Sequence, residues 1–171
     1  ATTPTITTEY VYREGSSPDW TTSVFDSNNT ADFSSITPPP YAGLECILAE
    51  QGHYGSTRGI RFSTGIPISR DDYVQLSFWI YLTVDLIAAG KTRGYVFLYA
   101  DNTPASSEYV GYARFESFID MTLTGQWQLV SIPTAQFSAN PINTTIGFLN
   151  ITLWPNLGSF APVEFALDEI K

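Results

Sequence analysis

The chain has little of the material from which metal centres, disulfide frameworks and nucleophilic active sites are built. It contains one cysteine, Cys46, and one histidine, His53, in 171 residues. A lone cysteine cannot form an internal disulfide, and one histidine with one cysteine cannot supply a zinc site of those ligands. Cys46 lies within the largely apolar run from Leu44 to Leu48, so we expect a buried, structural thiol.

Positive charge is also scarce. Eight Lys and Arg residues stand against 17 Asp and Glu residues, which gives a formal net charge of −9. Such a field repels phosphate backbones and anionic membrane surfaces. We therefore expect neither nucleic acid nor acidic lipid as a partner. An uncharged polysaccharide is compatible with this net charge.

No apolar run approaches the roughly 18 residues that a membrane span needs, so we expect no membrane insertion. The chain begins Ala-Thr-Thr without a basic segment or an apolar signal core, as a processed mature terminus would. Three asparagines, Asn28, Asn143 and Asn150, stand in glycosylation sequons. These features favour a secreted, extracellular glycoprotein.

Strand signals dominate the sequence. Thr, Tyr, Phe and Val are abundant, and no segment sustains apolar residues at helical spacing over three turns. Short runs bounded by turn residues recur about every 8–14 residues, which predicts nine or ten strands in an all-β, two-sheet antiparallel β-sandwich (jelly roll) formed by residues 1–171 as a single domain. The expected strands are 5–13, 23–25, 43–49, 58–62, 74–84, 94–100, 109–118, 126–133, 146–154 and 163–170.

The clearest alternation runs from Val74 to Val84. Successive side chains of a strand point to opposite faces of a sheet. Trp79 and Tyr81 therefore face away from the apolar row, which comprises Leu76, Phe78, Ile80 and Leu82.

Aromatic residues make up 15% of the chain, with 11 Phe, 10 Tyr and 4 Trp. This is more aromatic surface than a core of this size requires. Some of these rings are therefore expected on the surface.

Five segments together resemble a known family. They are YREGSSPDW, GSTRGIRF, YVQLSFWIYL, WQLVSIP and the closing FALDEIK, which run in order between Tyr12 and Lys171. In this order the chain is similar to the jelly-roll carbohydrate-binding modules of the galactose-binding-domain-like type. The resemblance implies a lectin-like, non-catalytic domain that binds a polysaccharide or glycan through exposed aromatic residues. It also implies that Trp20 and Trp127 lie in the core, because the family buries Trp at these places.

A sugar ring presents an apolar face of C–H groups, so its site needs flat aromatic rings beside hydrogen-bonding groups. Tyr112 and Arg114 share one face of their expected strand and form a stacking and hydrogen-bonding pair. In a further strand, Tyr95, Phe97 and Tyr99 alternate with Val96 and Leu98, so both faces are apolar. Either set could fill the core, and the sequence leaves open which one does. The expected ligand-binding residues are Trp79, Tyr81, Tyr112, Arg114 and Trp154.

The resemblance also implies one structural Ca²⁺, because members of the family commonly hold it with oxygen ligands from the first turn, a loop and the terminal acidic pair. Glu14, Glu45 and Asp168 would supply carboxylates here. Arg13 departs from the family pattern, which often has an acid at its place. The alternative is that these acids are simply solvated.

The sequence offers no convincing pair of catalytic carboxylates. Glu116 and Asp120 would lie about 13 Å apart on one extended strand, beyond the roughly 5–9.5 Å that a glycosidase pair requires. We expect no enzyme. The alternatives are a jelly-roll glycoside hydrolase or polysaccharide lyase, and an extracellular structural or adhesion protein.

Overall fold

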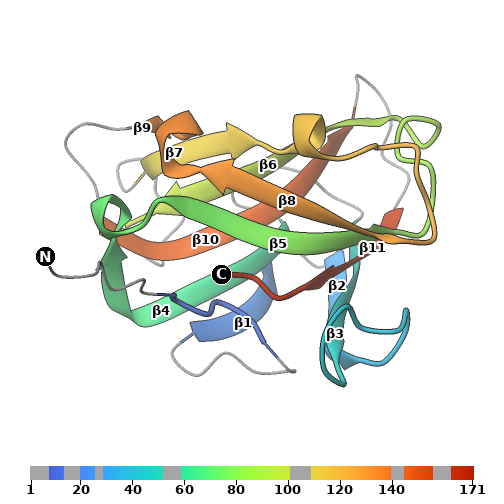
Figure 1. Cartoon of the computed structure of the whole chain (residues 1–171), viewed down its shortest axis with the longest axis horizontal. Helices are drawn as coiled ribbons and strands as arrows, with labels where there is room; N and C mark the ends of the chain where they lie inside the picture. Colours follow the sequence, from blue (N-terminus) through green and yellow to red (C-terminus); the bar gives the residue numbers. More distant parts are fainter. Residues whose placement is uncertain are drawn as a thin grey trace, which may run out of the picture.

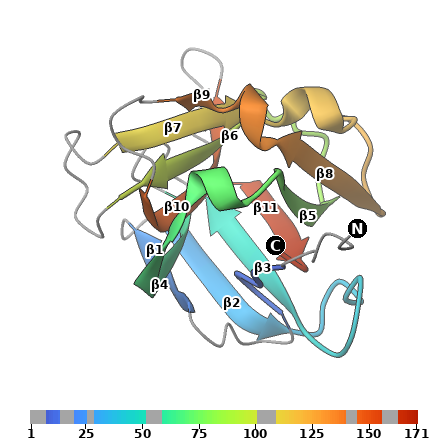
Figure 2. The same cartoon turned by 60° about the vertical axis from the view of Figure 1, so that its left-hand side comes forward.

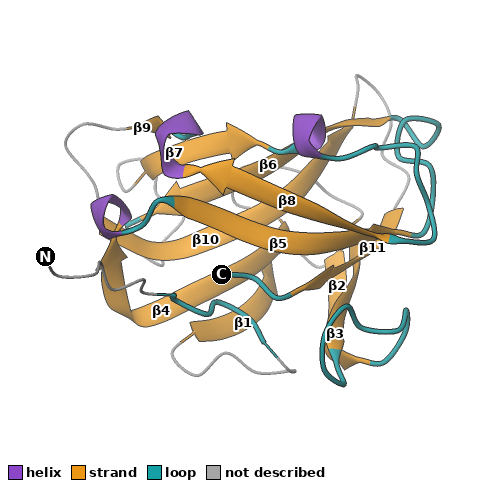
Figure 3. Cartoon of the chain, viewed as in Figure 1, coloured by secondary structure: helices purple, strands orange, loops and turns teal. Residues whose placement is uncertain are grey.

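The structure is a computed structural model of the chain. Within the part it describes, eleven strands and three short 3₁₀ helices occur, shown in orange and purple in Figure 3. None of the helices in that part has the length or apolar character needed to cross a bilayer. The described residues are 8–13, 20–25, 29–51, 59–100, 109–139, 145–155 and 163–171.

One sheet has six strands in the order β1-β4-β10-β6-β7-β9, and its neighbours pair antiparallel. The long strand β10 lies between β4 and β6 and crosses the molecule behind β5 in Figure 1. Its strands are β1 (Trp20–Phe25), β4 (Gly59–Ser69), β6 (Lys91–Tyr99), β7 (Tyr109–Arg114), β9 (Ser138–Ala139) and β10 (Thr145–Pro155).

The second sheet has five strands in the order β2-β3-β11-β5-β8, again antiparallel. Figure 2 shows β11, the last strand of the chain, inserted between β3 and β5. Its strands are β2 (Asn29–Ser35), β3 (Cys46–Gln51), β5 (Gln75–Leu82), β8 (Trp127–Pro133) and β11 (Val163–Asp168).

The expected all-β, two-sheet sandwich is confirmed, but several expected elements differ. Strand β2 was not expected, because its sequence NTADFSS is polar and only Asn29 and Ser35 are buried. Within residues 8–13, the expected first strand is reduced to an isolated bridge between Tyr12 and Ile170. The expected strand 109–118 ends at Arg114 and continues as a 3₁₀ helix, Glu116–Phe118.

The core lies between the two sheets and follows the alternation read from the sequence. Phe78, Ile80 and Leu82 of β5 are completely buried, and Leu149 and Ile151 of β10 belong to the same core. Alternation therefore leaves Trp79 and Tyr81 on the outer face of the five-stranded sheet.

One close approach in the core requires glycine. The ring of Phe115 packs against Gly94, where an added Cβ would lie 2.4 Å from a ring atom. The backbone N–H of Phe115 also donates to the Gly94 carbonyl at 2.8 Å. The missing side chain of Gly94 thus lets β6 accept the ring that follows β7, where Phe115 contacts Phe78 edge to face.

Candidate functional site

The expected ligand-binding residues divide between the two outer faces of the sandwich. Trp79 and Tyr81 lie on the five-stranded sheet, whereas Tyr112 and Arg114 of β7 lie on the six-stranded sheet. The backbone of Trp154 pairs with Arg93 in the six-stranded sheet, and its side chain lies outside the described residues. One site cannot contain all of them.

Five aromatic rings form a cluster on the outer face of the six-stranded sheet, which we call the aromatic platform. Tyr95 and Phe97 of β6 stack with centroids 5.2 Å apart. Tyr112 contacts both, at 5.9 and 6.0 Å. Farther along the sheet, Tyr99 stacks on Phe148 of β10 at 4.7 Å. The cluster spans three neighbouring strands and is separate from the main core.

The platform presents one ring to solvent. Tyr112 is 39% exposed, whereas the other four rings are buried. Val96 and Leu98, which alternate with the rings of β6, belong to the core. The rings of β6, whose face the sequence did not decide, therefore lie on the outer face of the sheet. Two of them, Tyr95 and Phe97, pack against Tyr112.

Arg114 stands two residues from Tyr112 on the same face and is held by Glu116. Its Nε and Nη2 atoms both contact the Glu116 carboxylate, which also accepts the Gly94 N–H at 3.1 Å. The hydrogen bond that Arg114 donates to Glu116 raises the pKa of Arg114, so the guanidinium stays charged. Among the described residues, its other three N–H groups have no protein acceptor.

The same face contains a buried cation that sequence reasoning missed. Arg61 of β4 is 8% exposed, and its guanidinium lies 4.8 Å from the centroid of Phe148. Burial lowers the pKa of Arg61. An arginine beside Phe62 in the run GIRF was the available signal, since alternation sends it to the face opposite a core phenylalanine.

Asn150 is paired with Arg61 in register and is completely buried. A glycan needs a solvent-exposed asparagine, so this sequon cannot carry one in the folded chain. Asn28 and Asn143 lie outside the described residues, as does His53.

The outer face of the five-stranded sheet holds a second aromatic group. Tyr41, from the loop between β2 and β3, stacks on Trp79 with centroids 3.8 Å apart and planes inclined by 15°. Trp127 contacts Tyr81 edge to face at 5.5 Å. Trp127 is half-buried here and does not belong to the core, so that expectation was wrong, whereas Trp20 is buried as expected. Tyr41 was also missed, because nothing in the sequence tells which ring a loop will cover.

Three contacts hold the loop between β2 and β3 against this face. Trp127 donates its indole N–H to the Pro39 carbonyl at 2.9 Å. The Cys46 thiol donates to the Pro38 carbonyl at 3.6 Å. Ala42 donates its N–H to Asp168 at 3.1 Å. Cys46 is buried as expected, and burial raises the pKa of its thiol to about 11.

A groove of about 380 Å³ runs beside Tyr81 on this face. Sites for small ligands typically measure roughly 300–1,000 Å³. The residues that line it are Thr37, Pro38, Pro39, Leu48, Tyr81, Thr83, Thr124, Gly125 and Glu164.

Solved structures with a similar fold include carbohydrate-binding modules. The family 30 module of the cellulosomal cellulase Cel9D-Cel44B of Clostridium thermocellum is 14% identical over 95% of this chain and 94% of its own, with a TM-score of 0.55. Another crystal structure of a family 30 carbohydrate-binding module covers 95% of this chain, which spans 85% of that chain, with 14% identity and a TM-score of 0.55. No protein-family model and no curated protein sequence matches the chain.

The chain has the fold of a jelly-roll carbohydrate-binding module. At 14% identity the likeness concerns the fold, so the residues that would bind a ligand have to be argued from the chain itself.

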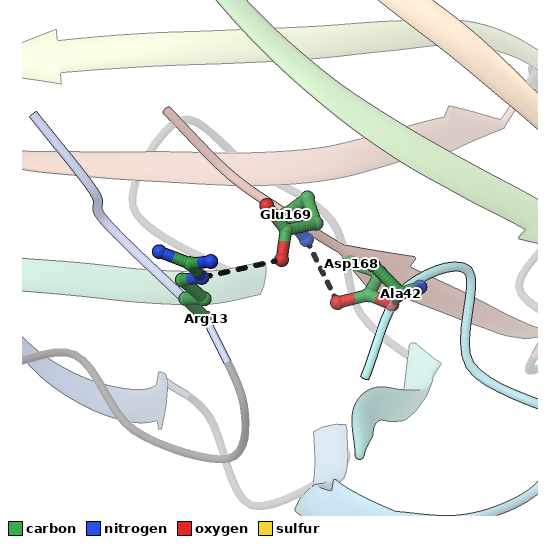
Figure 4. A network of polar contacts seen from close by, with 4 residues as sticks. All are labelled: Arg13, Ala42, Asp168 and Glu169. Atoms are coloured by element: carbon green, nitrogen blue, oxygen red, sulfur yellow. Dashed lines mark hydrogen bonds and ion pairs between the residues drawn. The ribbon is translucent and has the colours of Figure 1, made fainter. Parts of the chain in front are cut away.

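The acids expected to hold calcium differ in their burial. Asp168 is buried, and its Oδ1 and Oδ2 accept the N–H groups of Glu169 and Ala42 (Figure 4). Glu45 is half-buried just before β3, and Glu14 lies outside the described residues. Burial raises the pKa of Asp168.

The surroundings of Asp168 do not by themselves make a cation site. Glu169 is paired with Arg13, whose Nε lies 3.8 Å from the carboxylate. Within the described residues, no three His, Cys, Asp or Glu side chains come together as metal ligands. A Ca²⁺ ion at Asp168 therefore stays a prediction.

The carboxylates considered for catalysis have structural contacts. Glu116 holds Arg114 and the Gly94 N–H, and it lies in a 3₁₀ helix instead of a strand. Asp120 accepts from both the backbone and the hydroxyl of Thr122, and these bonds lower its pKa. A general acid of a glycosidase needs a raised pKa, so Asp120 does not fit that role.

Proposed function

We propose that this chain is a secreted, non-catalytic carbohydrate-binding module that holds a neutral polysaccharide or glycan at the exposed end of the aromatic platform. The observation that carries the proposal is the pairing of an exposed ring, Tyr112, with the guanidinium of Arg114 on one sheet face.

The physical roles follow from the contacts. The C–H face of a sugar stacks on the Tyr112 ring, which Tyr95 and Phe97 hold from behind. Arg114 donates N–H groups to the sugar hydroxyls in a fixed orientation, because Glu116 clamps the other edge of its guanidinium. A preorganised site loses less conformational entropy when it binds.

The charge of the chain favours a neutral ligand. The net charge of −9 disfavours polyanions such as uronate polymers. The positive charge of Arg114 is balanced by the carboxylate of Glu116, so the guanidinium serves as a hydrogen-bond donor to hydroxyls more than as a cation for a carboxylate. A neutral glycan fits these conditions best.

The test is binding of the purified domain to cello-, xylo-, laminari- and mannohexaose by isothermal titration. Tyr112→Ala should weaken binding by about 1–3 kcal/mol, as removal of a central aromatic contact does. Leu129→Ala is the control, since Leu129 is 46% exposed on the opposite sheet. A Tyr112→Ala protein that binds as the wild type does would move the site away from the platform.

A further inference from the structure

We infer that the groove beside Tyr81 is a second binding site for a neutral oligosaccharide, on the face opposite the aromatic platform, so that one domain holds two glycan chains. The inference rests on the proposed function for the ligand class. It concerns different residues on the other sheet.

The groove is built from both sheet and loops. Leu48 of β3 and Tyr81 of β5 contribute side chains on either side of β11. Pro38 and Pro39 form one wall, and Thr124 with Gly125 contributes to another. Segments far apart in the chain thus meet at one hollow.

Both walls are fixed before any ligand arrives. The Pro39 carbonyl accepts the Trp127 indole N–H at 2.9 Å, which ties the proline wall to β8. Gly125 donates its N–H to the Leu82 carbonyl at 3.0 Å and has a φ of 79°, a conformation that favours glycine. The groove is therefore a property of the folded chain and needs no closing movement.

Tyr81 is the aromatic ring that this groove offers. The stacking face of Trp79, its neighbour on β5, is covered by Tyr41 at 3.8 Å. Tyr81 instead touches Trp127 edge to face, with the planes at 61°, a geometry in which the flat face of Tyr81 is not stacked on Trp127. A sugar ring can lie against Tyr81 as it would against an exposed tyrosine.

The polar groups around Tyr81 suit hydroxyls. Thr37, Thr83 and Thr124 line the groove, and each hydroxyl can both donate and accept. The Thr83 hydroxyl donates to the Glu164 carbonyl at 2.7 Å, which leaves its oxygen as an acceptor. The exposed carboxylate of Glu164 accepts from further hydroxyls.

Charge excludes the main alternative occupants. Glu164 is the charged residue of the lining, and no Lys or Arg is among the described residues that form it. Glu50 stands directly opposite Glu164 on β3 and adds a second negative charge nearby. Uronates, phosphates and acidic peptides are repelled, whereas an uncharged chain of hydroxyls is not.

The experiment measures stoichiometry. The purified domain is titrated calorimetrically with whichever neutral hexaose of the four binds it, and a thermal melt confirms that each variant is folded. We expect two sites for the wild type. Tyr81→Ala and Glu164→Gln should each remove one site or weaken it at least tenfold, whereas Tyr112→Ala should remove the other.

Two matched controls separate the groove from its surroundings. Glu50→Gln removes the same charge as Glu164→Gln outside the lining, and Leu129→Ala removes an exposed apolar side chain of the same face. Both should keep two sites. Because Glu164 is exposed, Glu164→Gln stays informative even if Tyr81→Ala fails to fold.

The outcomes distinguish the two proposals. One site that Tyr112→Ala abolishes and the groove variants leave unchanged overturns this inference and supports the proposed function. One site that only Tyr81→Ala and Glu164→Gln affect supports the groove as a glycan site, and it overturns both the platform and the binding of two chains by one domain. A wild type that binds none of the four hexaoses overturns both.

Discussion

The ring of Tyr41 stacks on Trp79 with centroids 3.8 Å apart and planes inclined by 15°. A sugar would occupy this position if Trp79 were an open platform. Tyr41 itself is 46% exposed, so solvent meets Tyr41, a loop residue, on this side of the pair. Trp79, the first residue we expected to bind a ligand, is thereby engaged in holding a loop.

We predict that Trp79→Ala lowers the free energy of unfolding by about 1–3 kcal/mol, because it removes a half-buried ring and the support of Tyr41. Urea denaturation of Trp79→Ala, Tyr41→Ala and the double variant measures the coupling of the two rings. We expect a coupling of about 0.5–1.5 kcal/mol. Strictly additive effects would show that the stacking contributes nothing.

Gly94→Ala should destabilise the fold strongly, by roughly 1–3 kcal/mol or more, because overpacking in a core forces neighbours to move. An added Cβ would lie 2.4–2.7 Å from three atoms of the Phe115 ring. Gly65→Ala is the control, since a Cβ there has no heavy atom within 4 Å. Thermal melts of both should differ clearly, and equal melting temperatures would contradict the packing argument.

Cys46 should make the fold less stable in alkali. Its pKa is about 11 in the folded chain, above the ordinary value of 9.0, so between these values the unfolded chain releases a proton that the folded chain keeps. Stability is full below pH 9.0 and falls as pH rises toward about 11.

Denaturation of wild type and Cys46→Ala at a series of pH values checks this. The free energy of unfolding of the wild type, relative to that of Cys46→Ala, should fall by up to roughly 3 kcal/mol over that range. A difference that does not change with pH would show that the thiol titrates normally.

Calcium is tested by a thermal melt with and without chelator. A ligand that binds only the folded state adds RT ln(1 + [L]/Kd), about 2.7 kcal/mol at a hundredfold excess, so calcium should raise the melting temperature by several degrees. Asp168→Ala lowers stability in both buffers, since Asp168 also accepts the Ala42 N–H. The informative quantity is therefore the difference between buffers, which should vanish in Asp168→Ala. Identical wild-type curves in the two buffers would show that the folded chain binds no calcium.

Much of the fold could be read from strand periodicity. The alternation from Val74 to Val84 correctly separated the core row from Trp79 and Tyr81, because a residue's place in a period of two decides its face. The same argument correctly placed Tyr112 and Arg114 together. Strand β2 was missed because its polar residues carry no apolar alternation, and only pairing with β3 makes it a strand.

The sequence alone determined the fold class, the core row of β5 and the outward direction of Trp79, Tyr81 and Tyr112. Periodicity is a local property, so it could not say which sheet each strand joins. Tertiary pairing decided that Trp79 and Tyr112 lie on opposite sides of the sandwich. Loop packing decided that Tyr41 covers Trp79 and that Trp127 donates to the Pro39 carbonyl, since these contacts join residues 38 and 88 positions apart. No pattern of neighbouring residues encodes such contacts.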